Sequence, residues 1–203
     1  MKYNPGIHHR RSIRLQGYDY SRAGLYFVTI CTRDRLCLFG KIQNGKMILN
    51  DAGTMIERQW QELINHFEKN KLHEFIVMPN HFHGIIEFPV GVPLVGTQNV
   101  FGGTPNVSAG TRDVPAGTRD VPQTTGQPQG IAPTVGNVVG AFKSLSTNEY
   151  IRNVKKNDWQ PFNKKLWQRN FYEHIVRDHG SYRQIAEYIQ TNPLQWQEDK
   201  YYE

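Results

Sequence analysis

The chain alternates between short stretches with a two-residue apolar period and longer stretches with a helical period. β-Branched and aromatic residues in the short stretches indicate strands, and Asn-Gly between two such stretches is typical of a β-hairpin. The expected strands lie at 25–32, within 36–49 around Asn44-Gly45, at 73–78, at 81–88 and at 166–177. Pro79-Asn80 separates 73–78 from 81–88, so these two segments form either a tight hairpin or one bent strand.

Apolar residues at helical spacing predict three helices. The helices are expected to run from a cap at Asn50 or Asp51 to Phe67, from about 135 to 152, and from a cap at Ser181 to about Asn192, before Pro193. Helices and strands alternate without regular βαβ units. They therefore predict an α+β ferredoxin-like sandwich, with an antiparallel sheet and helices on one face.

Residues 91–130 differ from the rest of the chain because they are rich in Gly, Pro, Thr, Val and Gln and contain few core-forming residues. The heptapeptide AGTRDVP at 109–115 repeats at once at 116–122, but its Gly and Pro exclude a coiled coil. We expect a disordered or loosely extended insertion, more readily a tolerated loop than a functional element. It divides one domain, at 23–90 and 131–197, which lies between a basic tail at 1–22 and a short tail at 198–203.

Charge and composition narrow the class of protein. The formal net charge is +6, and basic residues interspersed with aromatic ones concentrate at 1–22 and 141–177. This distribution fits a polyanionic partner, or else two solvated faces. Cys31 and Cys37 lack metal-ligand spacing and are expected to be free thiols. Without a secretory signal, or an apolar run of about 18 residues, a cytoplasmic location is expected.

His81 and His83 flank Phe82 within the expected strand at 81–88. Residues two apart in a strand share a face, so the two imidazoles lie side by side and Phe82 turns towards the core. Two histidines are too few for a closed structural zinc site, but they can hold a divalent metal that keeps open positions for a phosphate oxygen or water. A hydrogen-bonded pair of strand histidines fits the pattern as well.

Tyr188 and Asn192 lie four residues apart on the last expected helix and therefore share a face. The Asn side chain offers a carbonyl oxygen that suits a hard divalent ion, and the Tyr phenol can act as a nucleophile. Tyr188 is also at helical spacing from Ile185 and Ile189, which is typical of a core residue.

Five segments carry a recognisable pattern: YFVTICTRDRLCLFG, VMPNHFHGIIEF, FKSLST, LWQRNFYEHIVRD and YIQTNP. In this order they resemble the REP-associated tyrosine transposases, relatives of the single-tyrosine insertion-sequence transposases in the HUH endonuclease superfamily. The resemblance covers roughly residues 18–90 and 135–197. HxH alone is a weak motif, but HxH preceded by Met-Pro-Asn and followed about 100 residues later by YIxxNP is specific.

The resemblance implies that His81 and His83 bind one Mg²⁺ or Mn²⁺ and that Tyr188 is the catalytic nucleophile. Asn192 matches the position of the third metal ligand, where relatives often carry Gln. The implied reaction is attack of Tyr188 on single-stranded or hairpin DNA, which gives a 5′-phosphotyrosine and a free 3′-hydroxyl. Tyr182 is the nearest alternative tyrosine, but it lacks an Asn four residues later.

Given this resemblance, the basic residues are expected to bind the DNA backbone. They are Arg10, Arg11, Arg14, Lys143, Arg152, Lys155, Lys156 and Arg169. Three alternatives remain: a non-catalytic DNA-binding protein on the same fold, a metal nuclease that uses water, and a replication-initiator or relaxase-type HUH enzyme. The short stretch after Pro193 favours a monomer over a dimer that exchanges the tyrosine helix.

Overall fold

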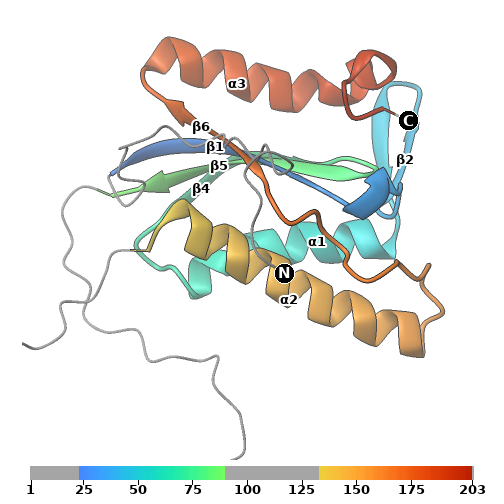
Figure 1. Cartoon of the computed structure of the whole chain (residues 1–203). Helices are drawn as coiled ribbons and strands as arrows, with labels where there is room; N and C mark the ends of the chain where they lie inside the picture. Colours follow the sequence, from blue (N-terminus) through green and yellow to red (C-terminus); the bar gives the residue numbers. More distant parts are fainter. Residues whose placement is uncertain (1–22, 90–132, 203) are drawn as a thin grey trace, which may run out of the picture. The chain divides into compact units, whose positions relative to one another are not determined.

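A four-stranded antiparallel sheet with the order β4-β5-β1-β6 forms the centre of the computed structural model, which describes residues 23–89 and 133–202. The strands are β1 (Gly24–Cys31), β4 (Lys71–Val77), β5 (His81–Phe88) and β6 (Tyr172–Val176). Helices α1 (Asp51–Gln61) and α2 (Val135–Lys156) cover one face of this sheet, and α3 (His179–Thr191) lies on the other face (Figure 1). The predicted α+β class is confirmed, although α3 departs from the expected single layer of helices.

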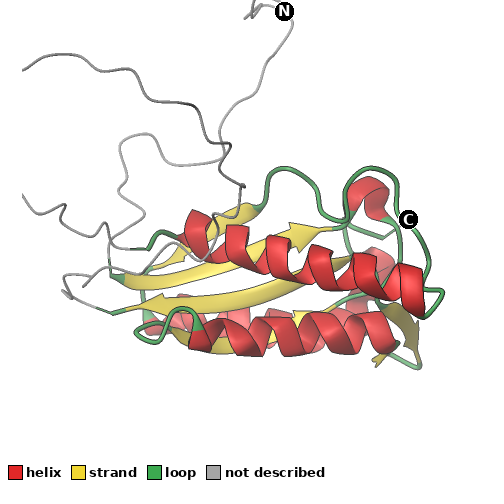
Figure 2. Ribbon diagram, turned by 90° about the horizontal axis from the view of Figure 1, so that it is seen from below, coloured by secondary structure: helices red, strands yellow, loops and turns green. Residues whose placement is uncertain are grey.

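Two short strands and three 3-10 helices complete the described part of the chain. Strands β2 (Gly40–Gln43) and β3 (Lys46–Leu49) form a separate hairpin, and 3-10 helices occur at η1 (Arg33–Arg35), η2 (Glu62–Asn65) and η3 (Asn192–Glu198). The turn of the hairpin has positive φ angles at Asn44 and Gly45, of 52° and 68°, as the Asn-Gly pair predicts. Figure 2, viewed from the side that carries α1 and α2, shows these two helices side by side in front of the strands.

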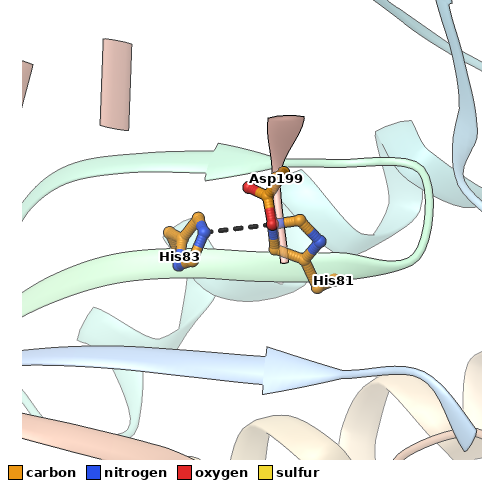
Figure 3. A group of neighbouring side chains, drawn as sticks. All are labelled: His81, His83 and Asp199. Atoms are coloured by element: carbon orange, nitrogen blue, oxygen red, sulfur yellow. Dashed lines mark hydrogen bonds between the residues drawn. The ribbon is translucent and has the colours of Figure 1, made fainter. Parts of the chain in front are cut away.

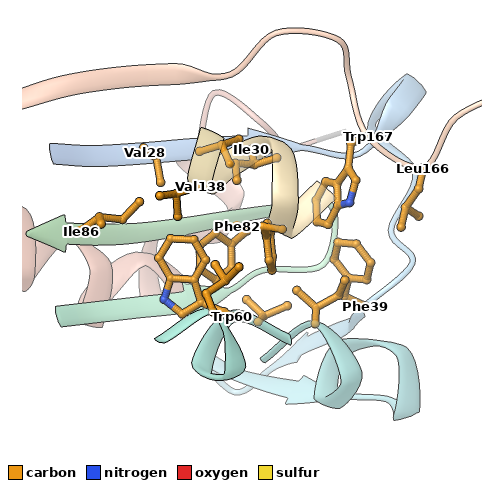
Figure 4. Close-up of a cluster of buried hydrophobic side chains, with 14 of the residues drawn as sticks. Val28, Ile30, Phe39, Trp60, Phe82, Ile86, Val138, Leu166 and Trp167 are labelled. Carbon is orange, nitrogen blue, oxygen red and sulfur yellow. The ribbon is translucent and has the colours of Figure 1, made fainter. Parts of the chain in front are cut away.

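The larger core lies between the sheet and the pair α1 and α2 (Figure 4). Phe82 of β5 packs there against Trp60 of α1 and Phe142 of α2, with ring centroids 4.5 and 5.2 Å away. Gly84, two residues along β5, leaves room for this packing, because a Cβ there would lie 2.7 Å from Cζ2 of Trp60. The opposite face carries a smaller core of Phe27, Ile85, Val176 and Ile189, on which α3 packs. Successive residues of β1 and β5 thus contribute side chains alternately to the two cores, one on each face of the sheet.

Several boundaries differ from the sequence prediction. Helix α1 ends at Gln61 and continues as η2, so the helix is shorter than expected. Asp178 caps α3, since its Oδ1 accepts a hydrogen bond from the Ser181 backbone N–H at 2.7 Å, and the prediction of Ser181 as the cap was wrong. Residues 166–171 are not in a strand; Trp167 makes a single bridge to Thr32.

Two further predictions can be compared with the described residues, 23–89 and 133–202. The basic tail at 1–22 and the whole insertion at 91–130 lie outside them. Cys31 and Cys37 are free thiols, as predicted. Within the described ranges, none of the helices combines the length and the apolar character that crossing a membrane requires.

Candidate functional site

His81 and His83 are the first and third residues of β5, and their imidazoles project from the sheet face that carries α3. Both side chains are buried, and their Nε2 atoms lie 3.0 Å apart. The ring of His83 stacks on Phe27, with a centroid separation of 5.3 Å. Phe82 points into the opposite core, as the two-residue period predicts.

Asn80 and Thr29 fix the orientation of the two rings. The Asn80 amide nitrogen donates to the carbonyl oxygens of Arg35 and Tyr201, at 3.1 and 2.8 Å, so its Oδ1 can only accept. This oxygen lies 2.9 Å from Nδ1 of His81, which therefore carries the proton. Thr29 Oγ1 lies 2.8 Å from Nδ1 of His83 in a corresponding position. Such outer partners hold metal-binding histidines with Nε2 free to coordinate.

The donor set fits a divalent cation. When Nδ1 is protonated in both rings, the Nε2 lone pairs of His81 and His83 face each other, and a cation between them stabilises this arrangement. Two ligand nitrogens at right angles and about 2.1 Å from one ion would lie about 3.0 Å apart, which is the separation observed. The residues present therefore suit the Mg²⁺ or Mn²⁺ that the sequence implies.

Asp199 adds a carboxylate to this pair, although it lies in the segment 198–203 that was expected to be only a short tail. Its oxygen and the imidazole nitrogens of His81 and His83 lie within 4.8 Å of one another (Figure 3). Asn192, the predicted third ligand, donates from Nδ2 to Oδ2 of Asp199 at 3.0 Å. The Oδ1 atom of Asn192 is buried and has no hydrogen-bond partner. Asp199 thus offers an oxygen beside the imidazoles, and Asn192 offers an unpartnered oxygen in the pocket that His83 also lines.

Tyr188 brings its hydroxyl to 3.4 Å from Nε2 of His83. Burial raises the pKa of this phenol to about 12, the charge of Asp199 adds to the shift, and a hydrogen bond to Asn192 opposes it. Few molecules would carry a phenolate at neutral pH without added positive charge nearby. The hydroxyl of Tyr182 instead donates to Oε2 of Glu74 at 2.5 Å, so the structure separates the two tyrosines as the sequence predicts.

These groups line an open pocket of about 530 Å³. Its walls come from β1, β5, β6, α3 and the residues that follow α3. The lining residues are Phe27, Thr29, His83, Tyr172, Tyr188, Asn192, Gln195, Glu198, Asp199 and Lys200.

The buried imidazoles predict acid sensitivity of the metal-free protein. Burial lowers the pKa of His81 to about 4 and that of His83 well below 6.5. In the unfolded chain these groups protonate near pH 6.5, so stability is present above that pH and is lost as the pH falls through about 4. In chelator, the free energy of unfolding is expected to drop by roughly 2–3 kcal/mol across this window. Thermal unfolding at successive pH values would measure the loss, and His81→Gln should reduce it.

The basic residues predicted to bind DNA do not gather in one place. Arg152, Lys155 and Lys156 are exposed on α2, which covers the sheet face opposite α3 and the pocket (Figure 1). Arg169 is exposed in the segment before β6. Arg10, Arg11 and Arg14 lie outside the described residues.

Lys143 points inward rather than towards a ligand. Its ammonium group donates to the carbonyl oxygens of Gln168, Arg169 and Asn170, at 3.0, 3.4 and 3.2 Å. Burial lowers its pKa to about 8. Lys143 therefore holds the 168–170 segment against α2, a role that the sequence does not reveal.

Replacing Lys143 with methionine is expected to destabilise the protein by roughly 1–3 kcal/mol, because three carbonyl groups would then be without their donor. Urea unfolding monitored by tryptophan fluorescence would measure the change. Lys156→Met, at an exposed position of the same helix, should shift the midpoint little. Equal effects of the two substitutions would contradict a structural role for Lys143.

Comparisons with known proteins found a relative in sequence and several solved structures of similar fold. No family model matches the chain. An uncharacterized protein from Haemophilus influenzae is 42% identical over 202 residues, which cover 99% of this chain and 97% of that protein. The solved structure of a REP-associated tyrosine transposase bound to a REP hairpin matches with a TM-score of 0.50 and 16% identity, over 90% of this chain and 74% of that chain. At this identity, the match establishes the fold.

Proposed function

We propose that this chain, which belongs to the same family as the Haemophilus influenzae protein and has the fold of the REP-associated tyrosine transposase, is a metal-dependent single-stranded DNA endonuclease and strand transferase. The observation that carries the proposal is the 3.4 Å approach of the Tyr188 hydroxyl to Nε2 of His83, beside the paired imidazole edges. A nucleophile and a cation-binding pair in one open pocket are what tyrosine transesterification requires.

His81 and His83 would hold Mg²⁺ or Mn²⁺ through Nε2, with an oxygen of Asp199 or Asn192 as a further ligand. When bound, this cation would supply positive charge to the scissile phosphate and to the developing phenolate. Asn80 and Thr29 keep the imidazole edges turned towards the pocket. Lys200, which lines the same pocket, adds a second positive charge.

Tyr188 is the nucleophile in this scheme. Its phenol gives its proton to water, its oxygen bonds to the phosphorus of the DNA strand, and the bond from phosphorus to the 3′ oxygen breaks, after which the 3′ oxygen takes up a proton from water. The products are a 5′-phosphotyrosine and a free 3′-hydroxyl. Attack by a DNA hydroxyl on the phosphotyrosine reverses the linkage, so the energy of the phosphodiester is conserved and strand transfer needs no nucleotide cofactor. Packing of α3 on the sheet sets the approach of the phenol.

The proposed substrate is single-stranded DNA beside a hairpin. The transposase of matching fold is bound to a REP hairpin, and the Tyr188 pocket is open on one side. The net charge of +6 favours a polyanion.

The test is a denaturing gel of the protein incubated with labelled hairpin DNA taken from beside its own gene, with Mn²⁺ or with chelator. The expected result is label that migrates with the protein only when metal is present, and a second product with a free 3′-hydroxyl.

Two other outcomes would contradict this proposal, and each would indicate a different function. Cleavage without a protein-linked product would indicate a nuclease that uses water. Retarded migration on a native gel without cleavage, over a panel of hairpins from the same locus, would indicate a DNA-binding protein.

A further inference from the structure

A basic pocket of about 470 Å³ lies beside η1, separate from the pocket that contains Tyr188. Its lining residues are Arg33, Asp34, Arg35, Gln168 and Arg169. Arg33 forms an ion pair with Asp34 at 2.9 Å. Three guanidinium groups against one carboxylate leave two net positive charges, so this pocket attracts an anion.

The backbone of this pocket is held in an uncommon conformation. Asp34 and Arg35 are adjacent non-glycine residues with φ angles of 55° and 52°. Such conformations persist only where the surroundings impose them, and they concentrate at functional sites. Here the 166–168 segment imposes them, because Arg33 N–H donates to Leu166 O at 2.7 Å and Gln168 N–H donates to Cys31 O at 2.9 Å. The loop is therefore a fixed scaffold for its side chains.

The same loop is joined to the candidate metal centre by two hydrogen bonds. Asn80 donates to the Arg35 carbonyl oxygen while its Oδ1 accepts from His81, so one amide connects the loop to an imidazole. The Arg35 guanidinium donates to the carbonyl oxygen of Lys200 at 3.2 Å, and Lys200 lines the Tyr188 pocket. Arg35, which lines the basic pocket, is thus hydrogen-bonded both to Asn80, the partner of His81, and to Lys200 of the Tyr188 pocket.

We propose that this pocket binds a backbone phosphate of the same DNA strand whose scissile phosphate reaches Tyr188. The inference rests on the proposed function and adds a second binding point for its substrate. Guanidinium groups suit phosphate because their N–H pairs match two phosphate oxygens. The rigid loop then sets the distance between the bound phosphate and the scissile one, and so selects which phosphodiester is presented to the nucleophile.

The test measures binding of a labelled single-stranded oligonucleotide by anisotropy at several salt concentrations, in a Tyr188→Phe background that cannot cleave. Arg33→Gln with Arg169→Gln is expected to weaken binding about tenfold. It should also reduce the slope of log K against log salt by about 0.7 for each phosphate that the protein no longer neutralises. Arg177→Gln with Arg183→Gln removes the same charge from exposed positions elsewhere and serves as the control.

Replacing the phosphates of the oligonucleotide one at a time with a neutral methylphosphonate would identify the phosphate that the basic pocket binds. One methylphosphonate position should weaken binding to the protein with intact arginines and have no effect on the Arg33 and Arg169 variant. Equal reductions of affinity in the test and control pairs, or unchanged binding in the test pair, would overturn the inference. Thermal unfolding checks that both pairs fold.

The adduct gel separates this inference from the proposed function. If the wild type forms an adduct but Arg33→Gln with Arg169→Gln leaves DNA binding unchanged, the phosphate-binding inference is wrong and the proposed function stands. If the arginine pair lowers affinity but no adduct forms, the function fails and phosphate binding stands.

Discussion

Replacing Tyr188 with phenylalanine is expected to abolish the covalent protein–DNA product and to lower the rate of cleavage by at least about a thousandfold, because loss of a nucleophile removes the whole covalent path. The substitution deletes one oxygen from a half-buried ring and leaves its contact with Phe27. Folding should therefore be nearly unchanged. The measurement is a single-turnover time course on a denaturing gel with Mn²⁺.

Tyr182→Phe is the matched control, because it deletes the same atom from the same helix. It removes the hydrogen bond to Glu74, outside the Tyr188 pocket, and should retain the adduct. If the adduct forms with Tyr188→Phe but not with Tyr182→Phe, Tyr182 is the nucleophile. Cleavage that survives both substitutions would rule out a tyrosine mechanism.

Replacing His83 with glutamine is expected to lower Mn²⁺ affinity by at least about a hundredfold, since even partners of metal ligands contribute factors of 10 to 100. Glutamine keeps much of the side-chain volume in a fully buried position. Isothermal titration of the metal-free protein with Mn²⁺ would measure the change. His66→Gln, at an exposed position, should bind like the wild type. Mn²⁺ binding unchanged by His83→Gln would place the cation elsewhere.

The same titration distinguishes the two candidates for the third ligand. Asp199→Asn is expected to weaken Mn²⁺ binding more than Asn192→Ala, because it removes a negative charge that lies with the imidazole nitrogens within 4.8 Å. The reverse order would assign the ligand to Asn192 and leave Asp199 as its hydrogen-bond partner.

The sequence predicts the part of the site that lies on regular elements. A two-residue period places His81 and His83 on one face and Phe82 on the other, and a four-residue spacing places Tyr188 of α3 and Asn192, the residue directly after α3, in the same pocket. Both predictions agree with the structure because backbone geometry alone determines them.

The contributions of Asp199 and Lys143 were not predictable in this way. Asp199 follows η3, whose backbone departs from helical geometry at Gln195, so no period extends from Asn192 to it. Lys143 binds carbonyl groups about 25 residues further along the chain, an interaction that only tertiary packing creates. Alternation across 166–171 was misleading for a related reason, since Leu166 and Trp167 are buried by packing in the core rather than by strand pairing.

The direction of β5 has a consequence for the design of reporters. His81 begins the strand and Phe88 ends it, and eight extended residues span roughly 24 Å. The candidate site lies at the first end, and Pro89, which is exposed, directly follows the second end. A dye or an affinity handle attached at Pro89 would therefore be anchored roughly 24 Å from the imidazoles, at the end of the strand remote from the Tyr188 pocket.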